Sequence, residues 1–219
     1  TASPTKALGI GGTGDISLEG SSNAIAFYDS AALKAYITSQ SFGDHNGDGL
    51  GLVTSSAEPI KFFTNGSERM KIDSTGAVTM PLQPAFLASP AAEQTNLTNS
   101  TTLLFGTEVT DRNADYNAGT GTFTAPVTGL YQVGFSIRLQ EVPIDATYVM
   151  VETVSSNRSF YYILDPGSFD ENAAYWEFNG NYLIDMDAND TYFIRYIQSG
   201  GTTSTDMSTA SYSFGTLAC

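Results

Sequence analysis

The chain is poor in the side chains on which disulfide-stabilised proteins and many enzymes depend. It has one cysteine, Cys219, and one histidine, His45, among 219 residues. A single cysteine excludes an intrachain disulfide, so stability must come from packing or association. We expect Cys219 to be a free terminal thiol rather than an interchain bridge. A single histidine disfavours a catalytic triad or a zinc site within one chain, and we expect His45 to lie in a solvated turn.

Basic residues are also scarce. Nine Lys and Arg residues face 23 Asp and Glu residues, which gives a formal net charge of −14. Nucleic acids and anionic membranes are bound by clustered basic side chains, so neither is an expected partner. The longest apolar runs are too short to cross a bilayer. We therefore expect no nucleic-acid binding and no membrane insertion.

The residues that are abundant favour strands and turns. Charged residues make up only 15% of the chain, and hydrophobic residues make up 41%. Before Gln83 there are five basic and eight acidic residues, whereas four Arg and fifteen acidic residues follow. Pro81, Pro84 and Pro90 cluster at this division and favour an extended crossing. The sequence predicts an all-β protein with two domains, residues 1–82 and 83–219.

The first domain contains an internal repeat. Residues 18–25 align with residues 53–60 at an offset of 35, and the same offset places Phe27 on Phe62 and Ile37 on Ile72. Self-similarity at a fixed period indicates stacked units that are each too small to bury their own apolar face. The units span about residues 18–45 and 53–80. We predict a β-rich shaft in which several chains wind together and supply the missing contacts.

Short strands and turns fit this shaft. Apolar and polar residues alternate at 16–18, 25–27 and 60–62, and turn residues follow at 65–66 and 74–76. Residues 31–37 contain good helix formers, but we prefer a strand because their repeat partner, 68–72, leads directly into a turn.

One segment of the shaft resembles a known structure. Residues 66–78, with the sequence GSERMKIDSTGAV, are similar to the segment common near the C-terminal end of bacteriophage tail-fibre shafts. The resemblance implies a virion fibre that ends in a tip domain.

The second domain carries a spaced pattern of aromatic, apolar and turn residues. Its members are Phe105, Asp111, Tyr116, Phe123, Gly129, Tyr131, Val133 and Phe135. This pattern resembles the signature of the globular complement-C1q domain, in the superfamily shared with tumour necrosis factor; Val133 stands where that family has Phe. The resemblance covers about residues 83–219. It implies a ten-stranded jelly-roll sandwich that assembles as a compact homotrimer, with aromatic and aliphatic residues facing the threefold axis.

Period-two patterning supports a sandwich without the resemblance. Apolar residues alternate along 131–139 and again along 192–196, and proline and glycine interrupt the strands within 123–129. This is the pattern of packed antiparallel sheets.

A calcium loop is one interpretation of residues 44–49. Asp44, Asn46 and Asp48 place oxygen ligands at the first, third and fifth positions of an EF-hand-type loop, and Gly49 occupies the sixth. Ser55 stands at the twelfth position, where a bidentate Glu is expected, and neither flank resembles a helix. A polar turn is the alternative that we prefer, with no required cofactor.

Acidic and aromatic residues gather between 161 and 177. The candidates for receptor binding are Tyr161, Tyr162, Asp170, Glu171, Tyr175 and Trp176. Aromatic faces and carboxylates bind sugars by stacking and hydrogen bonding, and a pair of carboxylates also suits glycoside cleavage. The alternative is that the aromatics fill the core and the acids occupy loops. We favour binding over catalysis, and we find no phosphate loop or nucleophile elbow.

These features predict a trimeric fibre or spike tip of a virion, outside the cell, that binds a host-surface glycan or outer-membrane protein. Three weak contacts would give avidity, and the head would also trimerise the shaft. One alternative is a cellular extracellular C1q-like adhesin or ligand, for which a collagen-like Gly-X-Y stem would be typical; the sequence has none. A glycan depolymerase is the other alternative.

Overall fold

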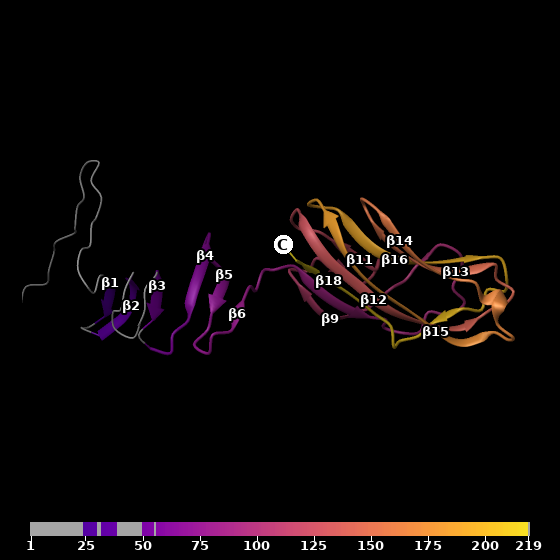
Figure 1. Ribbon diagram of the computed structural model, residues 1–219, viewed down its shortest axis with the longest axis horizontal. Helices are drawn as coiled ribbons and strands as arrows, with labels where there is room; N and C mark the ends of the chain where they lie inside the picture. Colours follow the sequence, from indigo (N-terminus) through magenta and orange to yellow (C-terminus); the bar gives the residue numbers. More distant parts are fainter. Residues whose placement is uncertain (1–23, 30–31, 39–49, 55, 219) are drawn as a thin grey trace, which may run out of the picture. The chain divides into compact units, whose positions relative to one another are not determined.

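A computed structural model describes residues 24–29, 32–38, 50–54 and 56–218 (Figure 1). The chain divides into two compact units, Thr1–Pro81 and Leu82–Cys219. This division lies one residue before the predicted one. The described elements are strands, apart from one 3-10 turn, η1 (Pro166–Ser168).

The N-terminal unit contains two small antiparallel sheets. The first pairs β1 (Ala24–Asp29), β2 (Ala32–Thr38) and β3 (Gly51–Thr54); the second pairs β4 (Ile60–Thr64), β5 (Ser67–Ile72) and β6 (Val78–Thr79). The offset of 35 residues places β1 on β4 and β2 on β5. Residues 32–38 form a strand rather than a helix, like their repeat partner. Asn65 and Gly66 connect β4 to β5 with φ angles of 48° and 73°, which is the conformation that a tight two-residue hairpin requires.

The N-terminal unit has little core of its own. Among its described residues, Tyr36 is the only buried large hydrophobic side chain. Apolar residues line an open groove of about 260 Å³ that Phe27, Leu52 and Phe62 share with Tyr36. Three-stranded sheets need a covering layer for stability, and the described residues of this unit do not provide one.

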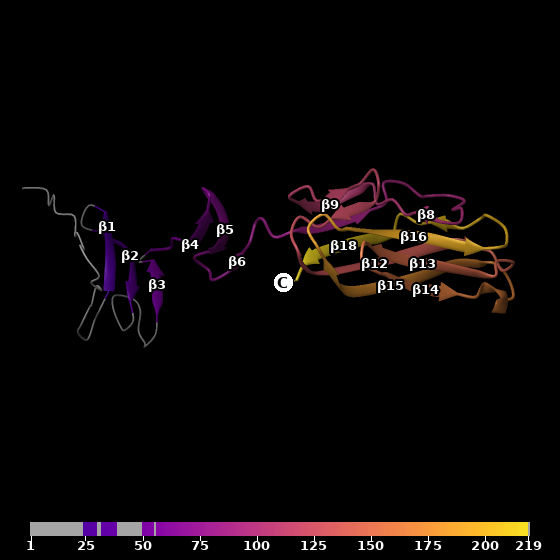
Figure 2. The same cartoon turned by 90° about the horizontal axis from the view of Figure 1, so that it is seen from above.

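The C-terminal unit, which we call the head, is a sandwich of two six-stranded sheets (Figures 1 and 2). The first sheet has the order β15-β12-β18-β7-β9, with β17 beside β12. Its strands are β7 (Ala85–Ser89), β9 (Thr107–Arg112), β12 (Gly129–Val142), β15 (Ala173–Met186), β17 (Asp206–Met207) and β18 (Tyr212–Leu217).

The second sheet has the order β10-β11-β16-β13-β14, with β8 beside β16. Its strands are β8 (Thr101–Thr102), β10 (Tyr116–Asn117), β11 (Thr122–Thr124), β13 (Tyr148–Ser155), β14 (Ser159–Leu164) and β16 (Thr191–Ser199). Neighbouring strands are mostly distant in sequence, as in a jelly roll. The predicted all-β jelly roll is confirmed. The head has twelve strands rather than ten, and three of them are only two residues long.

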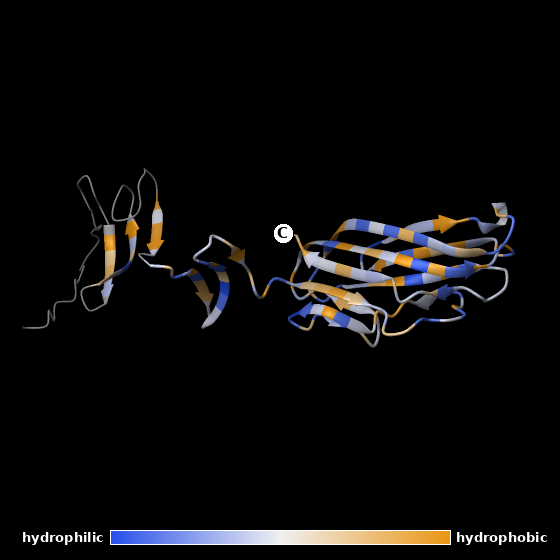
Figure 3. Ribbon diagram, turned by 90° about the horizontal axis from the view of Figure 1, so that it is seen from below, coloured by the Kyte–Doolittle hydropathy of each residue, from blue (hydrophilic) through white to orange (hydrophobic). Residues whose placement is uncertain are grey.

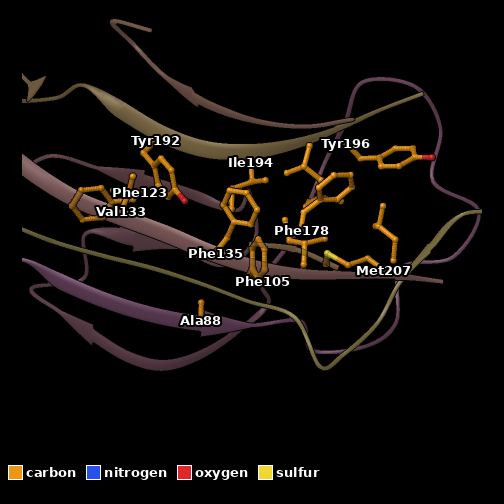
Figure 4. Close-up of a cluster of buried hydrophobic side chains, with 14 of the residues drawn as sticks. Ala88, Phe105, Phe123, Val133, Phe135, Phe178, Tyr192, Ile194, Tyr196 and Met207 are labelled. Carbon is orange, nitrogen blue, oxygen red and sulfur yellow. The ribbon is translucent and has the colours of Figure 1, made fainter. Parts of the chain in front are cut away.

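Alternation along the strands builds the core of the head. In β16, Tyr192, Ile194 and Tyr196 are buried and their neighbours are half-buried, and hydrophobic and hydrophilic residues alternate visibly along the long strands (Figure 3). The buried side chains of both sheets meet between them (Figure 4). Phe86 stacks on Tyr116 with ring centroids 4.6 Å apart. The core is therefore rich in aromatic contacts.

The eight residues of the spaced pattern have distinct positions. Six of them are buried in the core of the head: Phe105, Tyr116, Phe123, Tyr131, Val133 and Phe135. The carboxylate of Asp111 accepts hydrogen bonds from the backbone N–H groups of Asp115 and Tyr116, each at 3.2 Å. Asp111 thus closes the turn between β9 and β10, and Gly129 begins β12.

Candidate functional site

A loop at one end of the head lines a cavity near the predicted binding residues. The loop joins β14 to β15 and contains η1, whose first residue is Pro166 and whose preceding residue, Asp165, accepts a hydrogen bond from Gly167 N at 3.0 Å. Proline at this position and an acidic cap both favour the turn. The backbone N–H of Ile144 donates to Asn172 Oδ1 at 3.1 Å, which fixes the loop to the connection after β12.

Residues 168–176, which we call the cup, line a cavity of about 470 Å³. The rings of Phe169 and Trp176 lie 5.6 Å apart between centroids, at an interplanar angle of 37°. Tyr175 is 70% exposed and, as the residue before Trp176 on β15, lies on the opposite face of that strand. The cup therefore combines one exposed ring with two half-buried rings that pack against the core of the head.

The charge of the cup is negative. Asp170 and Glu171 are exposed, and neither forms an ion pair with a described residue. A smaller cavity of about 370 Å³ adjoins Tyr175 and Trp176 and contains Arg138. Arg138 already forms an ion pair, because its Nη2 atom lies 3.2 Å from Oε2 of Glu177.

Glu177, unlike Asp170 and Glu171, has hydrogen-bond partners within the first sheet. Hydrogen bonds from Ser136 Oγ, at 2.9 Å, and from Arg138 lower its pKa below the ordinary value. Both donors favour the ionised form of the carboxylate. The opposite charges of Glu177 and Arg138 thus cancel. Asp170 and Glu171 supply the net negative charge of the cup.

The structure brings together four of the six predicted binding residues: Asp170, Glu171, Tyr175 and Trp176 all line the cup. The other two lie on β14 and face opposite sides of the second sheet. Tyr162 packs edge-on against Phe135 inside the sandwich, with ring centroids 5.7 Å apart, whereas Tyr161 is exposed on the outside.

Two further residues of this region were not predicted. Phe169 lies inside the same acidic and aromatic segment, so its type and position were an available signal. Arg138 lies on β12 and lines the smaller, adjoining cavity, where it is the direct cross-strand neighbour of Glu177. Nothing local in the sequence indicates that pairing.

The environment of the two acidic residues favours binding over hydrolysis. Asp170 and Glu171 are consecutive exposed loop residues, whereas a glycosidase holds two carboxyl groups in different environments across the scissile bond.

The residues of the calcium-loop interpretation, Asp44, Asn46 and Asp48, and also His45, lie outside the described residues. Within the described ranges, no group of three or more His, Cys, Asp or Glu side chains is placed to hold a metal ion. A helix long and apolar enough to cross a bilayer does not occur in the described part of the chain.

A second candidate surface is the solvent-facing side of the first sheet, which we call the outer face. Its apolar members are Leu87, Leu130, Leu183, Tyr212 and Phe214. Leu183 is 59% exposed. The ring of Phe214 lies across Gly134, because a Cβ atom at that position would be only 2.5 Å from it. Polar residues of the same face, among them Gln132, Asn181 and Asp185, lie between these apolar side chains.

The head is thus a jelly-roll sandwich with a loop-lined cavity at one end. The family model of the C1q domain matches residues 85–217, and the chain therefore belongs to the C1q family. Domains of this family are generally non-enzymatic binding modules that form homotrimers, and the proteins that carry them are typically extracellular.

Solved structures that resemble the chain cover the head. The globular domain of zebrafish complement 1qA is 17% identical, with a TM-score of 0.45, over 63% of this chain and 98% of that one. Murine APRIL, in a crystal structure at pH 8.5, is 13% identical, with a TM-score of 0.43, over 62% and 99%. A comparison with curated protein sequences gave no match.

Proposed function

We propose that the chain acts outside the cell as a homotrimer that binds a cell-surface receptor. The observation that carries this proposal is the apolar outer face of the first sheet. Interfaces between identical chains are richer in apolar surface than the rest of a protein's exterior, and Leu183 and Tyr212 are exposed on this face. Packing three heads through the outer face would bury Leu130, Leu183 and Phe214.

The N-terminal unit supports assembly independently. Its two three-stranded sheets expose Phe27, Leu52 and Phe62 along one groove. A unit with so little core gains stability when several copies cover one another. A trimeric head would hold three such units at high local concentration, so trimerising this shaft is part of the proposed role.

We propose further that the protein is the tip of a bacteriophage fibre or spike. Residues 66–78, which resemble the end of a tail-fibre shaft, form the β5–β6 hairpin of the second repeat. The proposed receptor is a glycan or an outer-membrane protein of the host. Three equivalent sites would give avidity even where each contact is weak.

The second candidate is a cellular extracellular adhesin or ligand. The family match favours it as much as the virion role, because the match begins at residue 85 and carries no information on the shaft. Binding to intact bacteria or to animal cells distinguishes the two candidates.

Cell binding by matched variants tests the proposal. Leu183→Glu places a charge on the outer face, whereas Val127→Glu places the same charge in a turn, at an apolar residue that is 45% exposed. We expect labelled wild-type protein and Val127→Glu to bind one class of cell equally. Leu183→Glu should lose avidity by about 100-fold or more. Equal binding by Leu183→Glu, or no binding of the wild-type protein to any cell, would contradict the proposal.

A further inference from the structure

The cup combines aromatic rings with negative charge. Phe169, Trp176 and the exposed Tyr175 provide ring surface, and the faces of such rings attract both the C–H groups of sugars and cations. Asp170 and Glu171 add two carboxylates whose charge no described cation balances. A ligand that carries negative charge would be repelled.

The charge of the rest of the head also favours a cationic ligand over an anionic one. The head has fifteen acidic residues and four arginines, and three of the arginines already form ion pairs with carboxylates. A field of one sign raises the local concentration of oppositely charged ligands. The head therefore favours a cationic ligand before any contact forms.

The cup also contains hydrogen-bonding groups beyond the carboxylates. Asn172 uses its Oδ1 atom to accept from Ile144 N, which orients its amide NH2 as a donor. A simple alkylammonium needs only acceptors, whereas hydroxyl groups need both donors and acceptors. The cavity of about 470 Å³ is also wider than one ammonium group requires.

From these properties we infer that the cup binds a sugar with a free, protonated amine, such as a glucosamine unit of a partly de-N-acetylated glycan. The amine lies against Asp170 and Glu171, and the apolar face of the sugar ring lies on the aromatic surface. The inference rests on the proposed receptor-binding function and specifies its ligand.

The position of the cup is compatible with the proposed trimer. Tyr175 and Leu183 are eight residues apart on β15, which corresponds to roughly 26 Å along the strand. The cup is therefore well separated from Leu183, which lies on the edge strand of the proposed assembly surface. A trimer would present three cups and bind repeated amino sugars multivalently.

Intrinsic fluorescence tests the inference directly, because Trp176 is the only tryptophan of the chain. The full chain is titrated with a glucosamine oligomer at slightly acidic pH, and with the fully N-acetylated oligomer of the same length as a control. We expect a saturable change with the amine form and at least about tenfold weaker binding of the acetylated form. Equal binding of both forms, or no saturable change, would overturn the inference.

Two variants separate this inference from the function on which it rests. The double substitution Asp170→Asn with Glu171→Gln should weaken oligomer binding by about tenfold or more, whereas Glu108→Gln, an exposed acid on β9, should not. Tighter binding of a lysine peptide than of the oligomer would overturn the assignment to a sugar. If the double variant binds cells like the wild-type protein, the cup inference fails and trimeric receptor binding survives.

Discussion

Phe27 and Phe62 occupy equivalent positions in two copies of one hairpin. A β-bulge follows each of them directly, between Phe27 and Tyr28 in β1 and between Phe62 and Phe63 in β4. Bulges bend a strand and increase its twist, so both hairpins present their rings in the same way. The rings are 53% and 43% exposed, as expected for surfaces that another chain covers.

We predict that Phe27→Ser in the full chain loosens the N-terminal unit without affecting the head. A covered phenylalanine contributes about 1.5–3 kcal/mol, and its loss should raise amide hydrogen exchange in β1 and β2 while β12 and β16 stay protected. Thr79→Ser, at an exposed residue of β6, is the control. Unchanged exchange in β1 and β2 would show that Phe27 contacts no other chain.

A second prediction concerns Gly180. It is the direct cross-strand neighbour of Phe135, and a Cβ atom at position 180 would lie 2.5 Å from that ring. Gly180→Val should therefore destabilise the head by about 1–3 kcal/mol through overpacking, measured as a lower urea midpoint. Asn181→Val, at the next residue of the strand but on its opposite face, should change the midpoint much less. A similar midpoint for both variants would contradict the packing described for Phe135.

A third prediction concerns acid. Burial raises the pKa of Glu152, but hydrogen bonds from Arg195, Ser159 and Tyr161, together with the charge of Arg195, outweigh burial and hold the pKa below its ordinary value. Stability from Glu152 is therefore complete above the unfolded value of about 4.3 and is lost as pH falls through the lowered folded value. Glu152→Gln should cost about 1–3 kcal/mol at neutral pH and should flatten the acid limb of the stability curve. An unchanged acid limb would contradict this role.

A fourth prediction concerns alkali. Burial raises the pKa of Tyr196 to about 12 and also raises that of Tyr192. Unfolded tyrosine loses its proton near pH 10, whereas these folded tyrosines keep theirs, so stability falls as pH rises above about 10. Tyr196→Phe should make that decline shallower in urea titrations. Because the head contains no histidine or lysine, its stability should change little between about pH 6 and pH 9.

Much of the fold could be predicted because it depends on local periodicity. The alternation along 131–139 and 192–196 sets which side chains of β12 and β16 enter the core. The 35-residue offset likewise predicted that residues 31–37 and 68–72 are equivalent strands, and the structure places these strands at 32–38 and 67–72. The role of Asp111 was not predictable from periodicity, since it depends on two backbone N–H groups of the following turn.

The candidate site was predicted less completely, because closeness in sequence does not fix the face of a strand. Tyr161 and Tyr162 are adjacent, so the two-residue period of β14 directs them to opposite sides. Asp170 and Glu171 lie in the loop before β15, and Tyr175 and Trp176 lie at the start of β15, so one short segment of the chain carries all four. Arg138 lines the adjoining cavity only through the pairing of β12 with β15, which the sequence alone does not define.

The mass of the full chain in solution tests the central claim most directly. Sedimentation equilibrium at several protein concentrations gives this mass independently of shape. We predict a single species of about three times the 23.3 kDa of the chain, converted largely to monomer by Leu183→Glu. A wild-type protein that sediments as a 23.3 kDa monomer at every concentration would contradict the claim.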